Sequence, residues 1–506
     1  MEIATNLFKI AYKKLKSSLY YDKTQSIVRG KLVSFEADID DIDEYLEGMA
    51  NEFLNEETRV ELFEKILSSI SFYAFPKSLV SEESDIIKNY SKCDIVVEDN
   101  QYFIDMDIRG HILGVLWLIL IGYRLDEKMY KHSYGNRIRR KLYNELSEAP
   151  TYSPYLFEPY FQQYESWRDT AMDQAMQHLH SGQDVVVLTL DFKRFYYSVD
   201  ISKELMDGIY EDIIVASEEE KDELKALNDF VYEVIIKYAS QFKEFNGMRI
   251  LPIGFLPSNV LANYALRNFD KAILDGWNPI YFGRYVDDVI VVDKIETNSD
   301  LFNKAEINEL KAEDIITFFL KQCSGWKGLN GIKCKNNKKY ALLYEDICDN
   351  GNNNEEHKFV LNKMYNPVEG DNSHIVIKND KVKIFYFKSG ESDALITCFK
   401  ETISKNKSEF RHMPEDESIF QKDDYSKIYD LQNEETINKF RGITGISIDK
   451  FELSKLLGKH LRIGGLVTDV KEAGFDTQIG KILNKRVIIE NYNVWEKIIE
   501  ILLIKE

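Results

Sequence analysis

The spacing of apolar and polar positions divides the chain into predicted strands and helices. Short apolar runs predict a strand over 185–190, a hairpin over 281–293, and a second hairpin over 374–387 with Asn379 and Asp380 at its turn. Apolar residues at helical spacing predict helices in the first thirty residues and over 60–75, 230–242, 260–269, 307–323 and 392–506. The chain is therefore expected to combine helices with antiparallel strands in an α+β fold.

The most apolar run is GVLWLILIGY, over 114–123. It is far shorter than the roughly 20 residues that cross a bilayer, so it predicts a core helix and no membrane segment. The first thirty residues lack the continuous apolar core and the small-residue cleavage site of a signal peptide. They are expected to pack on the protein, with a membrane-surface helix as the alternative.

Composition adds information on charge and compartment. The chain has 506 residues and a formal net charge of −20, and its length suits about three or four domains. Its five cysteines show no CxxC spacing, which predicts reduced thiols in a cytoplasmic protein. Because phosphate contacts need Lys and Arg, this charge implies that any nucleic acid would bind a locally basic groove.

Carboxylates end two of the predicted strands. The hairpin YFGRYVDDVIVVD places Asp287 and Asp288 at its turn, and the strand over 185–190 stops at Asp191. By itself, an acidic turn is equally typical of a solvated loop. Asp191 and Asp287, on adjacent strands, would supply oxygen ligands for two Mg²⁺ ions, with Mn²⁺ as an alternative. Asp288 follows directly and must point elsewhere, so we assign it a supporting role.

The segment LPIGFLPSNVLANYAL lies between these acids. Gly254 and Pro257 predict an irregular loop, and Ser258 is positioned to cap the helix that follows. A helix N-terminus offers backbone N–H groups and a positive dipole end, which suit contact with a template or nucleotide. An ordinary capped helix is the alternative, and the two interpretations are compatible.

The order of these segments resembles the palm of reverse transcriptases. DFKRFYYSVD, LPIGFLPSNVLAN and RYVDD are similar to the first three catalytic motifs of that family, and GIKCKNNKKY over 331–340 looks like the fourth. The resemblance covers about residues 130–345. It implies the fingers and palm of a right-hand polymerase, followed by an α-helical C-terminal domain.

This resemblance implies a division into four parts. They are an N-terminal helical region with the fingers over 1–180, a palm over 181–345, a connection with a β-hairpin over 346–390, and an α-helical thumb or repeat domain over 391–506.

The resemblance also implies roles for individual residues. Three carboxylates would be catalytic and hold the metals: Asp191, Asp287 and Asp288. The carbonyl of Phe192 would add a further metal ligand. Lys338 would lie near the leaving pyrophosphate, with Lys339 as the close competitor and a solvated lysine-rich turn as the alternative.

Other residues are expected to bind the nucleotide. Tyr196 matches the position at which the family places an aromatic ring under the incoming sugar. A bulky ring there would clash with a 2′-hydroxyl, which predicts the use of deoxynucleotides; a palm-core aromatic is the alternative.

Gly254 is expected to contact the nucleotide. Three arginines of NRIRRK are candidates for contact with the triphosphate, and a surface charge run is the alternative: Arg137, Arg139 and Arg140. The residues expected to support the motifs are Arg284, Tyr285 and Ser258.

The tail resembles defence-associated, abortive-infection-type reverse transcriptases of bacteria, at KIFYFKSGESDALITCFKETISKNKSEFRHMPED and IDKFELSKLLGKHL. This resemblance implies an antiphage enzyme that forms homo-oligomers, trimers or hexamers, and makes a DNA product from dNTPs. A structured non-coding RNA would serve as template or scaffold, or synthesis would be untemplated and primed on a protein hydroxyl.

Two alternatives remain. A group II intron- or retron-type reverse transcriptase would share the chemistry. A catalytically inactive RNA-binding scaffold would be expected to have lost one of the three acids. All three are present, which favours an active enzyme.

Overall fold

The computed structural model describes residues 5–80 except 23, 95–142, 145–146, 153–311 except 214–217 and 246, 314, 343–349, 355–361, 383–390, 429–433, 443–464 and 480–503 except 481. These residues combine helices with one four-stranded sheet and several two-stranded sheets. The expected mixture of helices and sheets is therefore confirmed.

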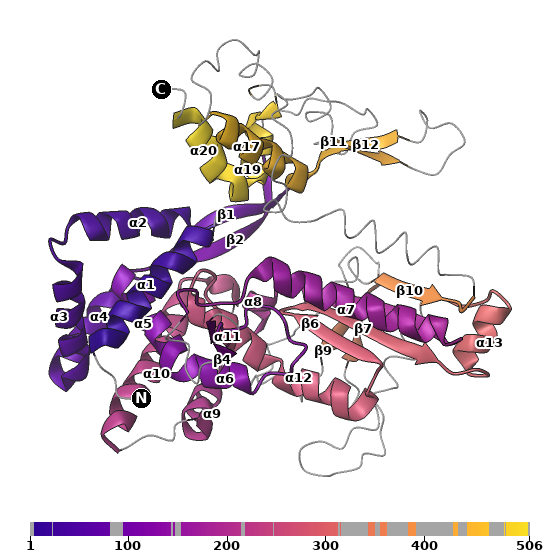
Figure 1. The fold of residues 1–506 in the computed structure, drawn as a ribbon, viewed down its shortest axis with the longest axis horizontal. Helices are drawn as coiled ribbons and strands as arrows, with labels where there is room; N and C mark the ends of the chain where they lie inside the picture. The colour runs from indigo at the N-terminus through magenta and orange to yellow at the C-terminus, as the bar shows by residue number, and fades with distance from the viewer. Residues whose placement is uncertain are drawn as a thin grey trace. The chain divides into compact units, whose positions relative to one another are not determined.

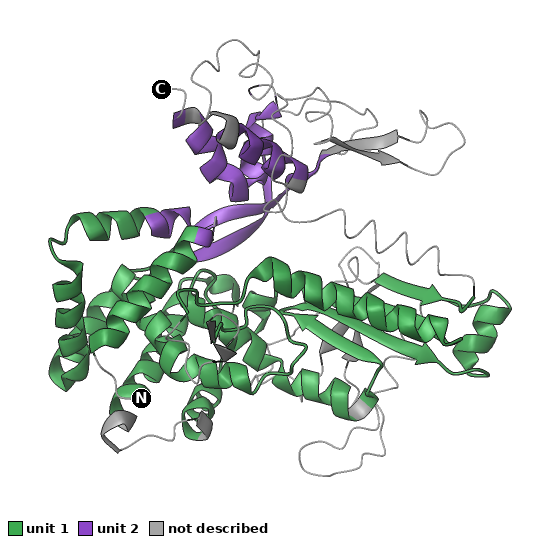
Figure 2. Ribbon diagram, viewed as in Figure 1, with its two compact units in different colours: residues 1–20, 30–72, 104–401 green, residues 21–29, 73–103, 402–506 purple. Residues whose placement is uncertain are grey.

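The chain forms two compact units, shown in different colours in Figure 2. The first contains residues 1–20, 30–72 and 104–401, and the second contains residues 21–29, 73–103 and 402–506. Two N-terminal segments thus belong to the same unit as the C-terminal residues, so the units do not follow the order of the sequence.

A four-stranded antiparallel sheet carries the predicted acids (Figure 1). Its strands, in spatial order, are β10 Lys383–Phe387, β5 Asp184–Asp191, β7 Asp288–Ile295 and β6 Tyr281–Tyr285. The strand predicted over 185–190 and the hairpin predicted over 281–293 are both confirmed. β10 matches the end of the hairpin predicted over 374–387 and pairs with β5. The proposed turn at Asn379 and Asp380 lies outside the described residues.

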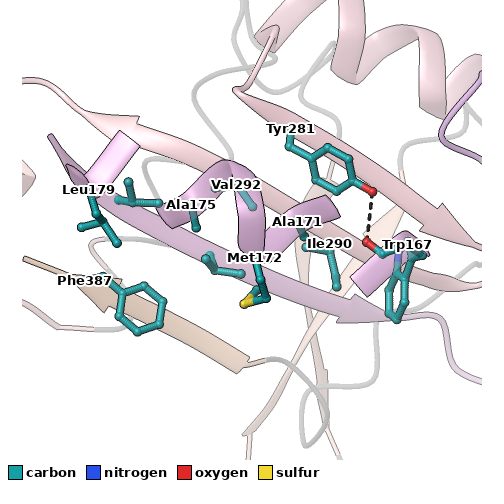
Figure 3. Packing of buried hydrophobic residues seen from close by; sticks show 11 residues of the cluster. Trp167, Ala171, Met172, Ala175, Leu179, Tyr281, Ile290, Val292 and Phe387 are labelled. Carbon is teal, nitrogen blue, oxygen red and sulfur yellow. Dashed lines mark hydrogen bonds between the residues drawn. The ribbon is translucent and has the colours of Figure 1, made fainter. Parts of the chain in front are cut away.

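Helix α7, Tyr160–His180, lies along one face of this sheet (Figure 1). Strand residues alternate between faces, so every second residue of β5 points toward α7. Figure 3 shows the resulting core, whose buried members are Trp167, Ala171, Met172, Ala175, Leu179, Val185, Val187, Tyr281, Ile290, Val292 and Phe387. The Tyr281 hydroxyl donates to the Trp167 carbonyl at 3.1 Å. Burial of each large apolar side chain contributes about 1.5–3 kcal/mol, so this core fixes α7 against the sheet.

The opposite face of the sheet packs against α12, Arg267–Ala272, which follows α11, Leu256–Ala265. The ring of Phe269 on α12 lies 6.1 Å from that of Phe282 on β6 and 5.5 Å from that of Phe192, which follows β5. Helices therefore cover both faces of the sheet.

Residues 108–127 form a helical stretch interrupted by a π turn, with the bounds α5 Ile108–Trp117, η1 Leu118–Gly122 and α6 Tyr123–Glu127. It confirms the core helix predicted over 114–123, and Trp117 Nε1 donates to Asn228 Oδ1 at 3.0 Å. Among the described residues, the stretch Ile108–Glu127 is long and apolar enough to cross a membrane, and 83% of its most apolar window is buried inside the protein. Such burial is typical of a core helix.

The N-terminal helices are α1 Thr5–Tyr21, α2 Ser26–Ala37, α3 Ile42–Leu54 and α4 Glu56–Ser68. The amphipathic helix predicted in the first thirty residues is confirmed as α1. The helix predicted over 60–75 is wrong in its second half, because α4 ends at Ser68 and β1, Ser71–Leu79, pairs with β2, Val97–Asp105. The run SFYAF has the aromatic content that favours a strand.

The remaining elements of the first unit are β3 Lys141–Leu142, β4 Glu145–Leu146, α8 Phe195–Ser198, α9 Lys203–Ile213, α10 Glu218–Ala239, η2 Lys243–Phe245, η3 Ile273–Trp277, α13 Asp300–Glu306, β8 Leu343–Asp349 and β9 Glu355–Leu361. The helix predicted over 230–242 is the C-terminal part of α10. The helix predicted over 307–323 lies mostly outside the described residues.

The C-terminal elements belong to the second unit and are β11 Tyr429–Asn433, β12 Ile443–Ile448, α17 Lys450–Gly464, α19 Lys485–Glu490, η9 Tyr492–Val494 and α20 Trp495–Leu503. The prediction of a wholly helical tail is wrong in part, because β11 and β12 form an antiparallel pair. The run ITGISI is rich in β-branched residues, which favours a strand. The helices share one apolar cluster that includes Leu453, Leu457 and Ile498.

The β1–β2 hairpin packs with these C-terminal helices inside the second unit. The ring of Phe75 stacks on Tyr492 with centroids 4.8 Å apart and meets Trp495 edge-on at 5.3 Å. The Tyr492 hydroxyl donates to Gln101 Oε1 at 2.7 Å. Segments far apart in the sequence therefore build one core.

Candidate active site

Three carboxylates gather at one end of the four-stranded sheet. Asp191 is the last residue of β5, and its register partner on β7 is Asp288. Directly opposed residues on antiparallel strands share a face, with Cβ atoms about 4.5–5.5 Å apart. Asp287 is the second residue of the two-residue turn between β6 and β7. The fold thus brings the three predicted acids together.

The register corrects one expectation about these acids. The sequence predicts Asp191 and Asp287 on adjacent strands, with Asp288 turned away. Instead, Asp288 faces Asp191 across the strand pair, because the turn consists of Val286 and Asp287 and β7 begins at Asp288. Asp191 is buried, and the two hairpin aspartates are half-buried.

The two hairpin carboxylates have different aromatic neighbours. Burial and then the negative charge of Asp287 raise the pKa of the Tyr196 phenol. Burial and then the charge of Asp288 raise the pKa of Tyr164 on α7. The pKa of Tyr285 is also raised, first by burial, with Asp288 among its charged neighbours. Asp287 therefore lies near the segment that follows β5, and Asp288 lies near the first turns of α7.

The donor set suits a hard divalent cation. In the described part of the chain, no group of three or more His, Cys, Asp or Glu side chains is arranged so that it could hold a metal ion. Mg²⁺ rarely uses such a cage, because it keeps several waters and binds one or two carboxylates together with substrate phosphates. Asp191 and the hairpin aspartates, at one end of the sheet, are oxygen donors of that kind. Their roles as metal ligands stay predictions.

The turn that presents Asp287 has an unusual backbone. Val286 has a φ of 56°, in the left-handed region where a β-branched residue is a genuine outlier. Two-residue hairpin turns favour Gly or Asn at such positions. A conformation of this kind costs about 1–3 kcal/mol and persists only where the surrounding structure holds it.

Arg284 of β6 holds this turn from the buried side. Its side chain is fully buried, and all five of its N–H donors have acceptors. Nε and Nη2 bind the Asp270 carboxylate of α12 at 2.8 and 2.7 Å. Nη1 binds the Val286 carbonyl at 2.8 Å and Asn263 Oδ1 of α11 at 2.9 Å, and Nη2 also donates to the Asn263 carbonyl at 3.3 Å. Arg284 therefore ties the strained turn to α11 and α12, which gives its predicted supporting role a physical basis.

Residues 132–135 pair with the edge of β6. The His132 carbonyl accepts the Arg284 N–H at 2.9 Å, and the Tyr134 N–H donates to the Arg284 carbonyl at 2.8 Å. A Cβ on Gly135 would lie 2.5 Å from Val286 Cγ2 and 2.9 Å from Val286 N. Glycine is required there because the backbone approaches the turn too closely for a side chain.

Tyr196, on α8, is hydrogen-bonded to an asparagine from another segment. Its hydroxyl donates to Asn259 Oδ1 of α11 at 2.9 Å. Both residues are half-buried. The charge of Asp287 is among the causes that raise the pKa of the phenol, so the Tyr196 hydroxyl lies within electrostatic reach of that acid.

The start of α11 differs from the expectation. The helix begins at Leu256, and Phe255 is its N-cap, without a side-chain cap bond. Ser258 lies inside the first turn, so its predicted capping role is wrong. Pro257 occupies the first turn, where its missing N–H needs no cap. Gly254 adopts a φ of 90° in the loop before the helix, as an irregular loop requires.

Arg137 is bound to the protein by all five of its N–H donors. Nε and Nη2 bind Asp126, and Nη1 binds the carbonyls of Tyr130 and Ser133. These bonds leave no donor for a phosphate, which argues against the predicted triphosphate contact of Arg137. Its observed role is to fix the segment that pairs with β6.

The other two arginines of this cluster also contact the protein. Arg140 pairs with Glu127, and the Arg139 guanidinium lies 5.2 Å from the centre of the Tyr155 ring. Their contacts with a triphosphate stay predictions.

Three further predicted residues have different outcomes. Lys338, with the whole segment 331–340, lies outside the described residues. Phe192 is buried, and its carbonyl remains a predicted ligand. The Tyr285 hydroxyl donates to the Tyr160 carbonyl at 3.4 Å, so this side chain links the hairpin to α7.

No sequence motif marks the polar residues that support the site. Asn263 of α11 and Asp270 of α12 are buried, and a buried polar group needs a partner. That rule signals a role for both residues but does not identify Arg284 as their partner. Asn259 neighbours Ser258, which the sequence singles out, yet its link to Tyr196 depends on two segments meeting.

No protein-family model matches the chain, and no curated protein matches it. A functional assignment therefore rests on the residues of this site.

Proposed function

We propose that the chain is a reverse transcriptase-type enzyme that synthesises DNA from dNTPs by two-metal nucleotidyl transfer. One observation carries the proposal: the register that sets Asp191 opposite Asp288, with Asp287 in the adjoining turn, gathers three carboxylates at the end of one antiparallel sheet. The motif order described above supplies the family. A mixed helix and sheet fold is compatible with a polymerase fingers and palm.

The proposed chemistry assigns roles to this chain's own residues. Asp191, Asp287 and Asp288 would hold two Mg²⁺ ions, or Mn²⁺. Such ions, when bound, stabilise the attacking and leaving oxygens of a displacement at phosphorus. The Tyr196 ring would exclude the 2′-hydroxyl of a ribonucleotide. Arg284 would keep the Asp287 turn in place through the Val286 carbonyl.

The proposed biological role is phage defence in the cytoplasm, and it rests on the resemblance of the tail. The partners would be dNTPs, a structured non-coding RNA, the DNA product and further copies of the chain in a trimer or hexamer. A group II intron- or retron-type enzyme is the alternative of the same chemistry. An inactive RNA-binding scaffold is the alternative of another class, and the intact set of three acids favours the enzyme.

The experiment that tests the proposal is DNA synthesis by the purified protein together with any RNA that accompanies it. Labelled dNTPs are added singly and together with Mg²⁺, and the product is sequenced with and without protease treatment. A DNA product complementary to the RNA would support templated synthesis. DNA that is released only by protease would support untemplated, protein-primed synthesis.

Asp191→Asn and Asp287→Asn are the matching variants. Each should reduce synthesis by orders of magnitude, because a metal ligand is lost while the side chain keeps its size. Asp300→Asn, at an exposed position of α13, is the control and should leave synthesis unchanged. Wild-type rates of synthesis in Asp191→Asn would refute the proposal.

A further inference from the structure

We infer that Asn259 is a specificity-determining residue, which selects deoxynucleotides by holding the Tyr196 ring in one orientation. This inference rests on the proposed function, because it concerns the sugar of the incoming nucleotide. It goes beyond that function in assigning sugar selection to a residue that need not touch the nucleotide.

The Tyr196 hydroxyl donates to Asn259 Oδ1 at 2.9 Å. Tyr196 lies on α8, just after the strand that ends at Asp191, and Asn259 lies on α11. The hydrogen bond therefore ties the end of the ring to a second element.

Both partners of this hydrogen bond belong to fixed backbone. Asn259 lies within α11. The Tyr196 carbonyl accepts the Leu251 N–H at 3.0 Å, which holds the α8 backbone in place.

Tyr196 and Asn259 are only half-buried, so packing alone does not fix the ring. A tyrosine ring turns about two side-chain torsions, and a ring that turned away would make room for a 2′-hydroxyl. Such a turn must first break the hydrogen bond to Asn259. The bond therefore holds the ring in the orientation that excludes the 2′-hydroxyl.

The test compares kcat/KM for a dNTP with kcat/KM for the matching rNTP in three variants. Tyr196→Ala removes the ring, Tyr196→Phe keeps the ring and removes the hydrogen bond, and Asn259→Ala removes the anchor. We expect the largest loss of discrimination in Tyr196→Ala. Tyr196→Phe and Asn259→Ala should each lower the dNTP/rNTP ratio by about tenfold, which corresponds to about 1.4 kcal/mol. Asn303→Ala, at an exposed position of α13, is the control and should leave the ratio unchanged.

The outcomes separate this inference from the proposed function. Relaxed sugar selection in Tyr196→Ala, with wild-type ratios in both Tyr196→Phe and Asn259→Ala, would overturn the anchoring role and leave the ring as the barrier. A parallel fall in dNTP and rNTP incorporation in Asn259→Ala, with the ratio unchanged, would identify Asn259 as merely structural and would also overturn it. Absence of any nucleotide incorporation by the wild-type protein would overturn the proposed function itself. A conservative Asn259→Gln variant that regains discrimination over Asn259→Ala would support the anchor.

Discussion

Removal of the Arg284 side chain should destabilise the first unit more than loss of any exposed ion pair. The change Arg284→Met keeps most of the apolar volume and removes the guanidinium. It leaves the Asp270 carboxylate, which is only 2% exposed, without its cation. It also takes a donor from the Val286 carbonyl and two from Asn263.

The magnitude follows from this geometry. Breaking a buried ion pair by removing one partner costs about 3–5 kcal/mol, because the remaining charge stays buried. Total stability of a folded protein is about 5–15 kcal/mol, so the expected loss is a large share of it. By contrast, the exposed pair of Lys225 with Asp229 on α10 should contribute less than about 0.5 kcal/mol.

Urea denaturation followed by circular dichroism measures these changes, provided that the slope of free energy against denaturant stays constant. Lys225→Met is the control and should be nearly neutral. The double variant Arg284→Met/Asp270→Leu should recover much of the loss, because an apolar pair can replace a buried ion pair at little cost. A cost below about 1 kcal/mol for Arg284→Met, or a double variant that is no more stable than the single one, would refute the buried ion pair as the source of the effect.

Two further predictions concern other positions of the first unit. Gly135→Ala should cost about 1–3 kcal/mol in urea denaturation, since its Cβ would lie 2.5 Å from Val286 Cγ2; the control Gly208→Ala on α9 meets open space and should not destabilise. Burial, and then Lys31, lowers the pKa of His111 to about 4, so the unfolded state binds more protons between about pH 6.5 and pH 4. Stability should fall by about 3 kcal/mol as the pH drops through that window, and an equal fall in His111→Asn would contradict this.

The sequence predicts those parts of the fold that local patterns control. The β5 strand and the two strands of the β6–β7 hairpin are short, mainly apolar runs with acids beside them. This pattern favours a strand over a helix. The sequence pattern does not predict the short strands β11 and β12. ITGISI is followed directly by residues with the spacing of an amphipathic helix, and that spacing dominates when the whole C-terminal segment is considered together. Predicted helices fail where aromatic residues fit a strand as well as a helix, as in β1.

Prediction of the site is limited by contacts between segments. The three acids can be found from their motifs, but the pairing of Asp191 with Asp288 depends on which residues form the turn. Ser258 has the right chemistry for a cap, but the helix begins two residues earlier, at Leu256, so Ser258 lies inside the first turn. Arg137 has the right charge for a phosphate, but its donors are bound to Asp126 and two carbonyls that no local pattern connects to it.

The composition of the second unit has a consequence for how the protein folds during synthesis. Tyr492, which binds Gln101 and stacks on Phe75, is 391 positions from Gln101 along the chain. At a translation rate of about 5–20 residues per second, the β1–β2 hairpin waits roughly 20–80 s on the ribosome before its C-terminal partners emerge. Throughout that interval the ring of Phe75, which is buried in the finished protein, lacks the aromatic partners that the tail supplies. The nascent chain therefore carries an unfinished apolar surface from the synthesis of β2 until Tyr492 and Trp495 have emerged from the ribosome.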